Sequence, residues 1–243
     1  MLHHTRGLVL RNVKYSDTSL ISKIYTEHFG VQSYMLQGIR SPRSMHKANL
    51  LQPMSFLSLV VYHKEGRNLQ RVKEFTPAFL YNEVPFDVRK GAVGLFMLEV
   101  LTKCLKEETG DVVLFEFLES SYRQLDDMDE GLGRFHLLFL LALTRFMGFF
   151  PSLPDHPDAQ LFDLREGMFI ADRPTHPDWL DQAQAKPLWQ LVKAYELNEP
   201  EGLNLSHQTR RVLLGDLLRY YEMHVANFSR VNAHAILETV FRD

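Results

Sequence analysis

Short apolar runs alternate with polar turn segments along the first third of the chain. The runs are rich in β-branched and aromatic residues, a pattern that predicts strands rather than helices. Polar or glycine-containing turns, including Gly30 and Lys64–Arg67, separate them. The predicted strands are Gly7–Lys14, Ser19–Thr26, Val31–Gln37, Phe56–His63 and Leu69–Phe75. Five short strands in one small domain favour a closed barrel of the OB type.

One connection in this region is too long for a tight turn. It runs from Gly38 to Pro53 with the sequence GIRSPRSMHKANLLQP. Long connections in compact domains often carry function. We therefore expect this loop to contribute to a binding site.

After Pro85 the apolar residues recur at helical spacing. Helices are predicted at about 93–105, 112–125, 132–149, 187–196, 206–227 and 233–241. The helix from Leu132 to Phe149 is apolar almost all round, which places it at the centre of a helical domain. Prolines interrupt residues 151–178, where Gln160–Ile170 is predicted to form a hairpin held by apolar side chains. These are Leu161, Phe162, Met168 and Phe169.

The pattern thus predicts an α+β chain of two domains. Residues 1–80 form a five-stranded OB-fold barrel, and residues 81–243 form an all-α domain with an irregular, hairpin-containing segment at 151–178. The charges divide at the same point. Residues 1–80 carry 11 Lys and Arg against 4 Asp and Glu, whereas residues 81–243 carry 16 against 26. A locally cationic module suits phosphate backbones.

Other sequence features limit the function classes. The single cysteine, Cys104, lies within a helical apolar pattern and is expected to be a buried thiol in a reducing compartment. The chain has no long apolar stretch, so we expect a cytoplasmic, nucleoid-associated protein without a membrane partner. The motifs of zinc proteases, serine hydrolases and P-loop enzymes do not occur. We expect no enzyme activity and no cofactor.

Several segments follow one known family in order and spacing. The opening GLVLRNVKYSDTSLISKIYTEHFG, the QGIRSPRS loop and LLQPMSFLSLVVY resemble the N-terminal domain of RecO, the bacterial recombination mediator. FMLEVLTKCLKEETGDVVLFEFLESSY and GRFHLLFLLALTRFMGFFPSL resemble its central helices. This resemblance implies an OB-fold domain that binds single-stranded and duplex DNA and a helical domain that binds partner proteins.

The family's activity is annealing rather than catalysis. The resemblance implies annealing of complementary strands coated with single-stranded-DNA-binding protein and, with RecR, loading of RecA in gap repair. RecF is a further candidate partner. Many family members carry a four-cysteine zinc site after the central helices, but residues 151–179 contain no cysteine here. His156, His176 and nearby aspartates are conceivable ligands, yet they lack the paired thiolate spacing, so we predict no metal.

DNA binding that tolerates any sequence should use cations that contact phosphates. The candidates are Arg40, Arg43 and Lys47 in the long loop, followed by Arg6, Arg11, Lys14, Arg71 and Lys73 on the strands. For each strand cation, a solvated surface role is the alternative. Tyr15, Tyr34 and Tyr62 are candidate stacking platforms, whereas Phe56 and Phe75 are expected to fill the barrel.

The partner tail, an acidic peptide ending in hydrophobic residues, needs an apolar pocket rimmed by cations. Arg134 is the expected anchor, because the RecO pattern also has arginine there and a guanidinium can bind a carboxylate bidentately. An ion pair with Asp127, Asp129 or Glu130 is the alternative for Arg134. Further candidates, with core packing as the alternative for the apolar ones, are Arg123, Phe135, Leu138 and Leu141.

Two rival functions remain open at this level. One is a protein-interaction adaptor with little DNA affinity, against which the cations of the long loop argue. The other is a metal-dependent hydrolase that uses His156 and His176.

Overall fold

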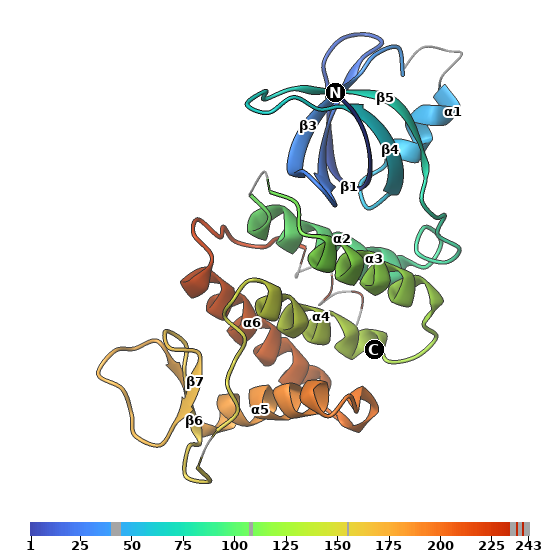
Figure 1. The fold of residues 1–243 in the computed structure, drawn as a ribbon. Coiled ribbons are helices and arrows are strands. Elements are labelled where there is room, and N and C mark those ends of the chain that lie inside the picture. The colour runs from blue at the N-terminus through green and yellow to red at the C-terminus, as the bar shows by residue number, and fades with distance from the viewer. Residues whose placement is uncertain (40–44, 107–108, 155, 234–236, 238–239, 241–243) are drawn as a thin grey trace. The chain divides into compact units, whose positions relative to one another are not determined.

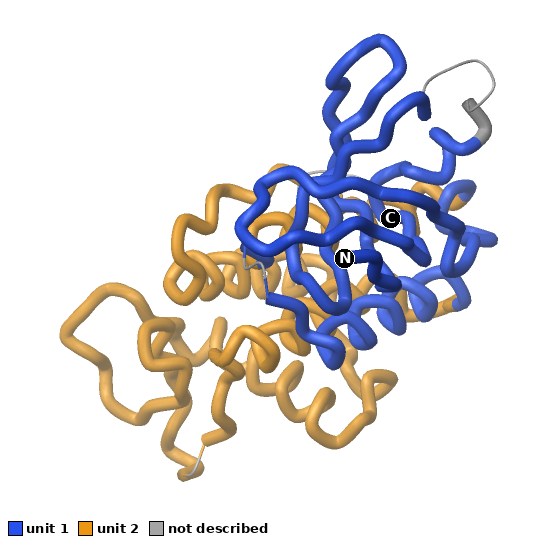
Figure 2. The backbone as a smooth tube through the Cα atoms, turned by 45° about the horizontal axis from the view of Figure 1, so that its top comes forward, with its two compact units in different colours: residues 1–86, 105–127 blue, residues 87–104, 128–243 orange. Residues whose placement is uncertain are grey.

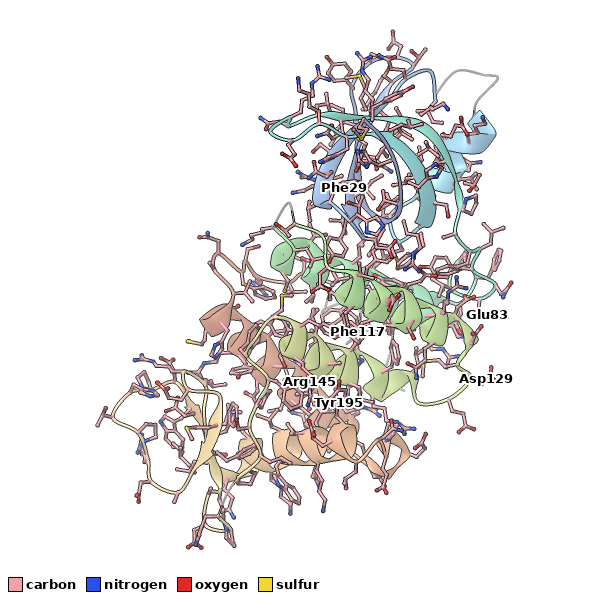
Figure 3. The ribbon with its side chains drawn as sticks, in the orientation of Figure 1. Phe29, Glu83, Phe117, Asp129, Arg145 and Tyr195 are labelled. Carbon is pink, nitrogen blue, oxygen red and sulfur yellow. The ribbon has the colours of Figure 1, made fainter. Side chains whose placement is uncertain are left out.

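The computed structural model divides into two compact units (Figures 1 and 2). Residues 1–86 with 105–127 form unit 1, and residues 87–104 with 128–243 form unit 2. The chain therefore passes from one unit to the other three times. The structure describes all residues except 40–44, 107–108, 155, 234–236, 238–239 and 241–243.

Unit 1 contains the predicted five-stranded barrel. Its strands are β1 (Leu2–Lys14), β2 (Leu20–Thr26), β3 (Gly30–Leu36), β4 (Phe56–Tyr62) and β5 (Gln70–Pro77). They close in the order β1-β2-β3-β5-β4, with a parallel contact between β3 and β5. The OB-type prediction is confirmed, and β1 begins five residues earlier than the sequence suggested.

The long β1 closes the barrel because it pairs with β2 through one half and with β4 through the other. A register shift between Val9 and Arg11 bends the strand where the pairing changes. Gly7 lies where the barrel wall leaves no room for a side chain, since a Cβ there would stand 2.6 Å from the Ile24 Cγ2 atom. Alternate residues of the strands fill the interior with Ile24, Tyr34 and their neighbours.

The long connection after β3 contains a short helix that packs against the barrel core. It contains α1 (Met45–Ala48) and the 3-10 turn η1 (Asn49–Leu51). Leu51 is 1% exposed and belongs to the barrel core, and the Asn12 side chain donates to its carbonyl. Ile39, which precedes the undescribed stretch 40–44, belongs to the same core.

Helix α3 (Val112–Asp127) also belongs to unit 1, although the sequence placed it in the helical domain. Phe56 points outward from β4 and packs against Phe115 and Tyr122 of this helix. The expectation that Phe56 fills the barrel is therefore wrong, because it belongs to the layer between barrel and helix. The structural division differs in this way from the sequence boundary near residue 80.

Unit 2 is built around α4 (Leu132–Phe146), as its apolar sequence predicted. This helix packs against α2 (Val88–Cys104), α5 (Gln182–Glu196) and α6 (His207–His224). Helix α5 begins at Gln182 rather than at Pro187, because Asp181 caps it by accepting from the Gln184 N–H.

Residues 147–206 of unit 2 carry a small sheet. It contains β6 (Leu161–Asp163), β7 (Met168–Ile170) and the unforeseen β8 (Trp179–Leu180); the 3-10 turn η2 (Pro200–Gly202) follows α5. Phe162 and Phe169 are buried as expected, but Met168 is 44% exposed and does not hold the hairpin.

An ion-pair network supports the same sheet. Asp178 accepts from Arg165 at 2.6 Å and from Arg219 of α6 at 2.9 Å. The two guanidinium groups hold the pKa of the Asp178 carboxyl below its usual range. Side-chain charge therefore tethers the hairpin to α6.

Among the described residues, no helix is long and apolar enough to cross a membrane. Cys104 is half-buried at the end of α2 rather than fully buried.

Candidate nucleic-acid interface

Strand pairing places several basic residues on the outer surface of the barrel. Arg11 of β1 pairs with Lys23 of β2, and Arg71 of β5 pairs with both Met35 of β3 and Tyr62 of β4. Directly opposed residues present their side chains on the same face of a sheet. Arg11 and Lys23 thus form one cross-strand pair, and Met35, Arg71 and Tyr62 form a second row. Lys23 itself pairs with Ser33, which lies two residues from Met35 on the same face of β3, so the two rows adjoin diagonally. We call these five residues together the basic lane.

The cations of the basic lane are available for a ligand. Arg11 and Arg71 are exposed and Lys23 is half-buried. Within the described part of the chain, no carboxylate lies at salt-bridge distance from any of these three. Lys23 was missing from the sequence candidates, because only the strand register shows that it lies beside Arg11.

Two hairpins at the rim of the barrel carry further cations. Gln70, only 1% exposed, orders the β4–β5 hairpin: its amide donates to the carbonyls of Lys64 and Arg67, and its oxygen accepts from the Lys64 N–H. The β1–β2 hairpin holds Lys14, whose ammonium lies 3.8 Å from Asp17. A buried glutamine beside a turn is a weak sequence signal, and Lys64 and Arg67 were not predicted.

The loop cations are only partly described. Lys47 is exposed on α1. Arg40 and Arg43 lie outside the described residues, so their roles remain predictions. Lys73 is exposed and forms an ion pair with Glu74 at 3.3 Å.

Arg6 differs from the other strand cations. Its guanidinium donates to both carboxylate oxygens of Glu27, at 3.0 and 2.7 Å, and to Glu119 of α3 at 2.8 Å. The hydrogen bond to Glu27 raises the pKa of Arg6 and lowers that of Glu27. Because the Arg6 guanidinium already binds these carboxylates, it links α3 to the barrel and has few donors left for a phosphate.

The three candidate tyrosines differ clearly in how much of each side chain is exposed. Tyr15 and Tyr62 are 61% and 51% exposed, which leaves a ring face available to a base. Tyr34 is fully buried in the barrel core, and burial raises its pKa to about 12. The prediction that Tyr34 is a stacking platform is therefore wrong.

The candidate tail-binding residues fall in different units. Arg123 belongs to unit 1, where it pairs with Glu119 at 2.7 Å and covers the Phe79 ring at 4.0 Å. Arg134, Phe135 and Leu138 lie on α4 in unit 2; Phe135 is buried, whereas Arg134 and Leu138 are half-buried. No described carboxylate forms an ion pair with Arg134.

A small hollow lies near Arg134, where the first turns of α4 and α6 meet. The Arg210 guanidinium stands 3.2 Å from the position that a Cβ of Gly133 would take. His136 lines the same hollow, and burial and the charge of Arg210 lower its pKa to about 4. Its imidazole is therefore neutral at neutral pH. Two arginines and two leucines contribute to the lining. The lining residues are Gly133, His136, His207, Arg210, Arg211, Leu214 and Leu237.

The histidines of the hydrolase hypothesis have ordinary local partners. His156 is exposed beside Asp158, and the His176 ring lies 3.1 Å from Asp163. Among the described residues, no group of three or more His, Cys, Asp or Glu side chains is arranged to hold a metal ion.

Comparison with known proteins identifies the family. Residues 1–81 match the family model "Recombination protein O N terminal", and residues 85–231 match "Recombination protein O C terminal". The chain belongs to the RecO family. The two family models meet between residues 81 and 85, whereas in the structure α3 groups with the barrel.

Relatives of full length support the assignment. A DNA repair protein RecO from Phocaeicola vulgatus is 31% identical over 241 residues, covering 99% of this chain and all of the relative. DNA repair protein RecO from Bacteroides fragilis is 32% identical over 243 residues with the same coverage. The RecO assignment gives this chain a role in DNA repair and recombination.

Proposed function

We propose that this RecO-family protein is a non-enzymatic mediator that binds single-stranded and duplex DNA through phosphate contacts. In this proposal it anneals complementary strands coated with single-stranded-DNA-binding protein and, with RecR, helps to load RecA. The observation that carries the proposal is the basic lane. It offers cations without carboxylate partners among the described residues, and the strands hold them on the outer surface of the barrel.

The chemistry of the lane suits annealing. Lysine and arginine contact phosphate oxygens without reading base edges, so binding tolerates any sequence. Exposed Tyr15 and Tyr62 add ring faces for unpaired bases. Arg40, Arg43 and Lys47 are the further proposed phosphate contacts, and of these only Lys47 lies within the described residues.

For the partner tail we propose the hollow between the first turns of α4 and α6. Its cations, with neighbouring Arg134, suit the acidic residues, while Leu214 and Leu237 suit an apolar end. Phe135 and Leu138 continue the α4 part of this proposed site. Arg123, engaged by Glu119 in the other unit, is a weaker candidate for the same tail.

The DNA proposal is tested by fluorescence anisotropy of a labelled oligonucleotide at two salt concentrations. We expect salt-sensitive, sequence-indifferent binding that Arg11→Glu with Arg71→Glu weakens at least tenfold. Each lost phosphate contact should lower the salt slope by about 0.7 for a single strand. Arg89→Glu, on exposed Arg89 of unit 2, is the matched control.

The two proposed sites are separable by mutation. Arg43→Glu with Lys47→Glu should weaken DNA binding and spare tail-peptide binding, and Arg134→Ala should do the reverse. No DNA binding by the native chain at low salt would reject the DNA proposal and favour the adaptor function.

A further inference from the structure

A groove follows one face of α5 in unit 2. A hollow of about 610 Å³ lies between the first half of the helix and the loop around Pro157. A second hollow, of about 330 Å³, lies between the later half and the segment that follows η2. Trp189 contributes to both hollows, so its half-buried indole is the wall between them.

The lining is apolar with cations on both sides of the indole. Lys186 lies on the side of the first hollow, and the Lys193 ammonium lies 5.1 Å from the centre of the Trp189 ring. Neither lysine has a carboxylate partner among the described residues. The apolar members of the lining are Pro154, Pro157, Ala159, Phe169, Ala185, Trp189, Ala194, Leu197 and Leu203.

The charge of the groove favours an anionic ligand. Glu199 is the one carboxylate among the described lining residues, and it lies in the second hollow, away from Lys186. Leu197, at the far end of the same helix face, is 55% exposed. A tryptophan in an apolar groove is typical of the central contact of a protein interface.

We propose that this groove binds a short acidic segment of a partner protein, with one apolar side chain in each hollow. Eight residues of helix separate Lys186 from Ala194, a rise of about 12 Å. An extended peptide covers that length in about four residues. The intervening acidic side chains would lie beside Trp189, within reach of Lys186 and Lys193.

The lining favours a peptide over a nucleic acid. Proline, alanine and leucine side chains contribute much of the surface, and two lysines provide few contacts for a phosphate backbone. This surface shares no lining residue with the hollow at the first turns of α4 and α6. The inference therefore stands apart from the proposed tail site and from DNA binding.

The test uses the tryptophans as reporters. The chain has two, and Trp179 lies in β8 beneath Arg173 at 4.7 Å. In a Trp179→Phe variant, Trp189 is the only source of tryptophan emission. The probe is a capped pentapeptide with leucine at both ends and three acidic residues between them, titrated to millimolar concentration.

We expect a saturable shift of Trp189 emission with the acidic probe and none with a matched peptide carrying three lysines. Lys186→Glu with Lys193→Glu should weaken the response at least fivefold, whereas Arg89→Glu and Arg134→Ala should leave it unchanged. Circular dichroism melting checks that each variant is folded. If Trp179→Phe is unstable, the native sequence labelled with fluorotryptophan should show a shift of one of its two ¹⁹F signals.

Three results would overturn the inference. They are the absence of any response to the acidic probe, an equal response to both peptides, and a shift caused by a single-stranded oligonucleotide instead. The last result would identify the groove as a nucleic-acid surface.

Discussion

Arg6 on the barrel and Glu119 on α3 form an ion pair of 2.8 Å between residues 113 positions apart in the chain. Glu119 also accepts from Arg123, and Arg6 is further bound to Glu27. The side chains of Glu27 and Glu119 are only 12% and 11% exposed. This network makes α3 part of the barrel unit, although α2, which precedes it, belongs to the other unit.

Arg6→Ala should destabilise unit 1 by about 1–3 kcal/mol at neutral pH. The change leaves the largely buried Glu27 without its main partner and removes one of the two cations that bind Glu119, which keeps Arg123. The usual cost of breaking a buried pair is reduced here because Arg6 is one-third exposed. Urea denaturation measures the change. Arg11→Ala is the control, since Arg11 is exposed and should cost little stability.

The same network predicts a stability change in acid. The hydrogen bond from Arg6 lowers the pKa of Glu27 in the folded state, so the stabilisation is present above the unfolded pKa of about 4.3 and is lost as the pH falls below it. In Arg6→Ala this loss should be smaller. An unchanged acid dependence would show that Glu27 does not titrate through Arg6.

Asp126 ties residues 82–84 to the end of α3. Its carboxylate accepts the backbone N–H groups of Asn82, Glu83 and Val84 at 2.7–2.8 Å, and the side chain is largely buried. Asp126→Ala should cost about 2–4 kcal/mol, because three backbone donors lose their acceptor. Asp126→Asn should cost less, since one oxygen still accepts. Equal denaturation midpoints for the two variants would contradict this.

The sequence determined the barrel more completely than the surface. Alternating β-branched residues and turn glycines suffice to locate five strands, because each strand buries one face. The same pattern does not predict which outward-facing residues of the barrel are covered by a helix. Phe56 and Arg6 both point outward, yet α3 covers the first and binds the second. The packing of α3 on the barrel depends on contacts between residues that are distant in the sequence.

The sequence predicted that the candidate site is basic, but it did not identify all of the residues that form the site. A cluster of cations within residues 1–80 was visible from charge alone. Lys23 joins it only through its register with Arg11. Tyr34 and Tyr62 look alike in the sequence, but the first faces the barrel core and the second faces outward. One residue of register exchanges the two faces of a strand.

Tyr62→Ala should weaken binding of a single strand more than binding of a duplex. The exposed ring pairs in register with Arg71, and an unpaired base that stacks on it contributes about 1–3 kcal/mol. Anisotropy with single-stranded and duplex oligonucleotides of equal length provides the measurement. Tyr34→Phe is the matched control for DNA contact, because Tyr34 is buried. An equal loss for both oligonucleotides would exclude stacking at Tyr62.

Asp216 on α6 provides the last prediction, since burial raises its pKa to about 6. One carboxylate oxygen accepts from Gln184 at 3.0 Å, but no described residue donates to the other, which is buried. The folded pKa lies above the unfolded value, so the charged form opposes folding at neutral pH. Unit 2 should therefore become more stable as the pH falls through 6 toward 4.

Asp216→Asn should remove this pH dependence and stabilise unit 2 at pH 8 by about 1–2 kcal/mol, a value reduced for partial exposure. Asparagine retains an oxygen for Gln184 and carries no charge. Thermal melting between pH 4.5 and 8 distinguishes the variants, with Asp158→Asn as a control at an exposed carboxylate. If Asp216→Asn melts below the native chain at pH 8, the carboxylate is a stabilising partner of Arg219 and its charge is retained for that contact.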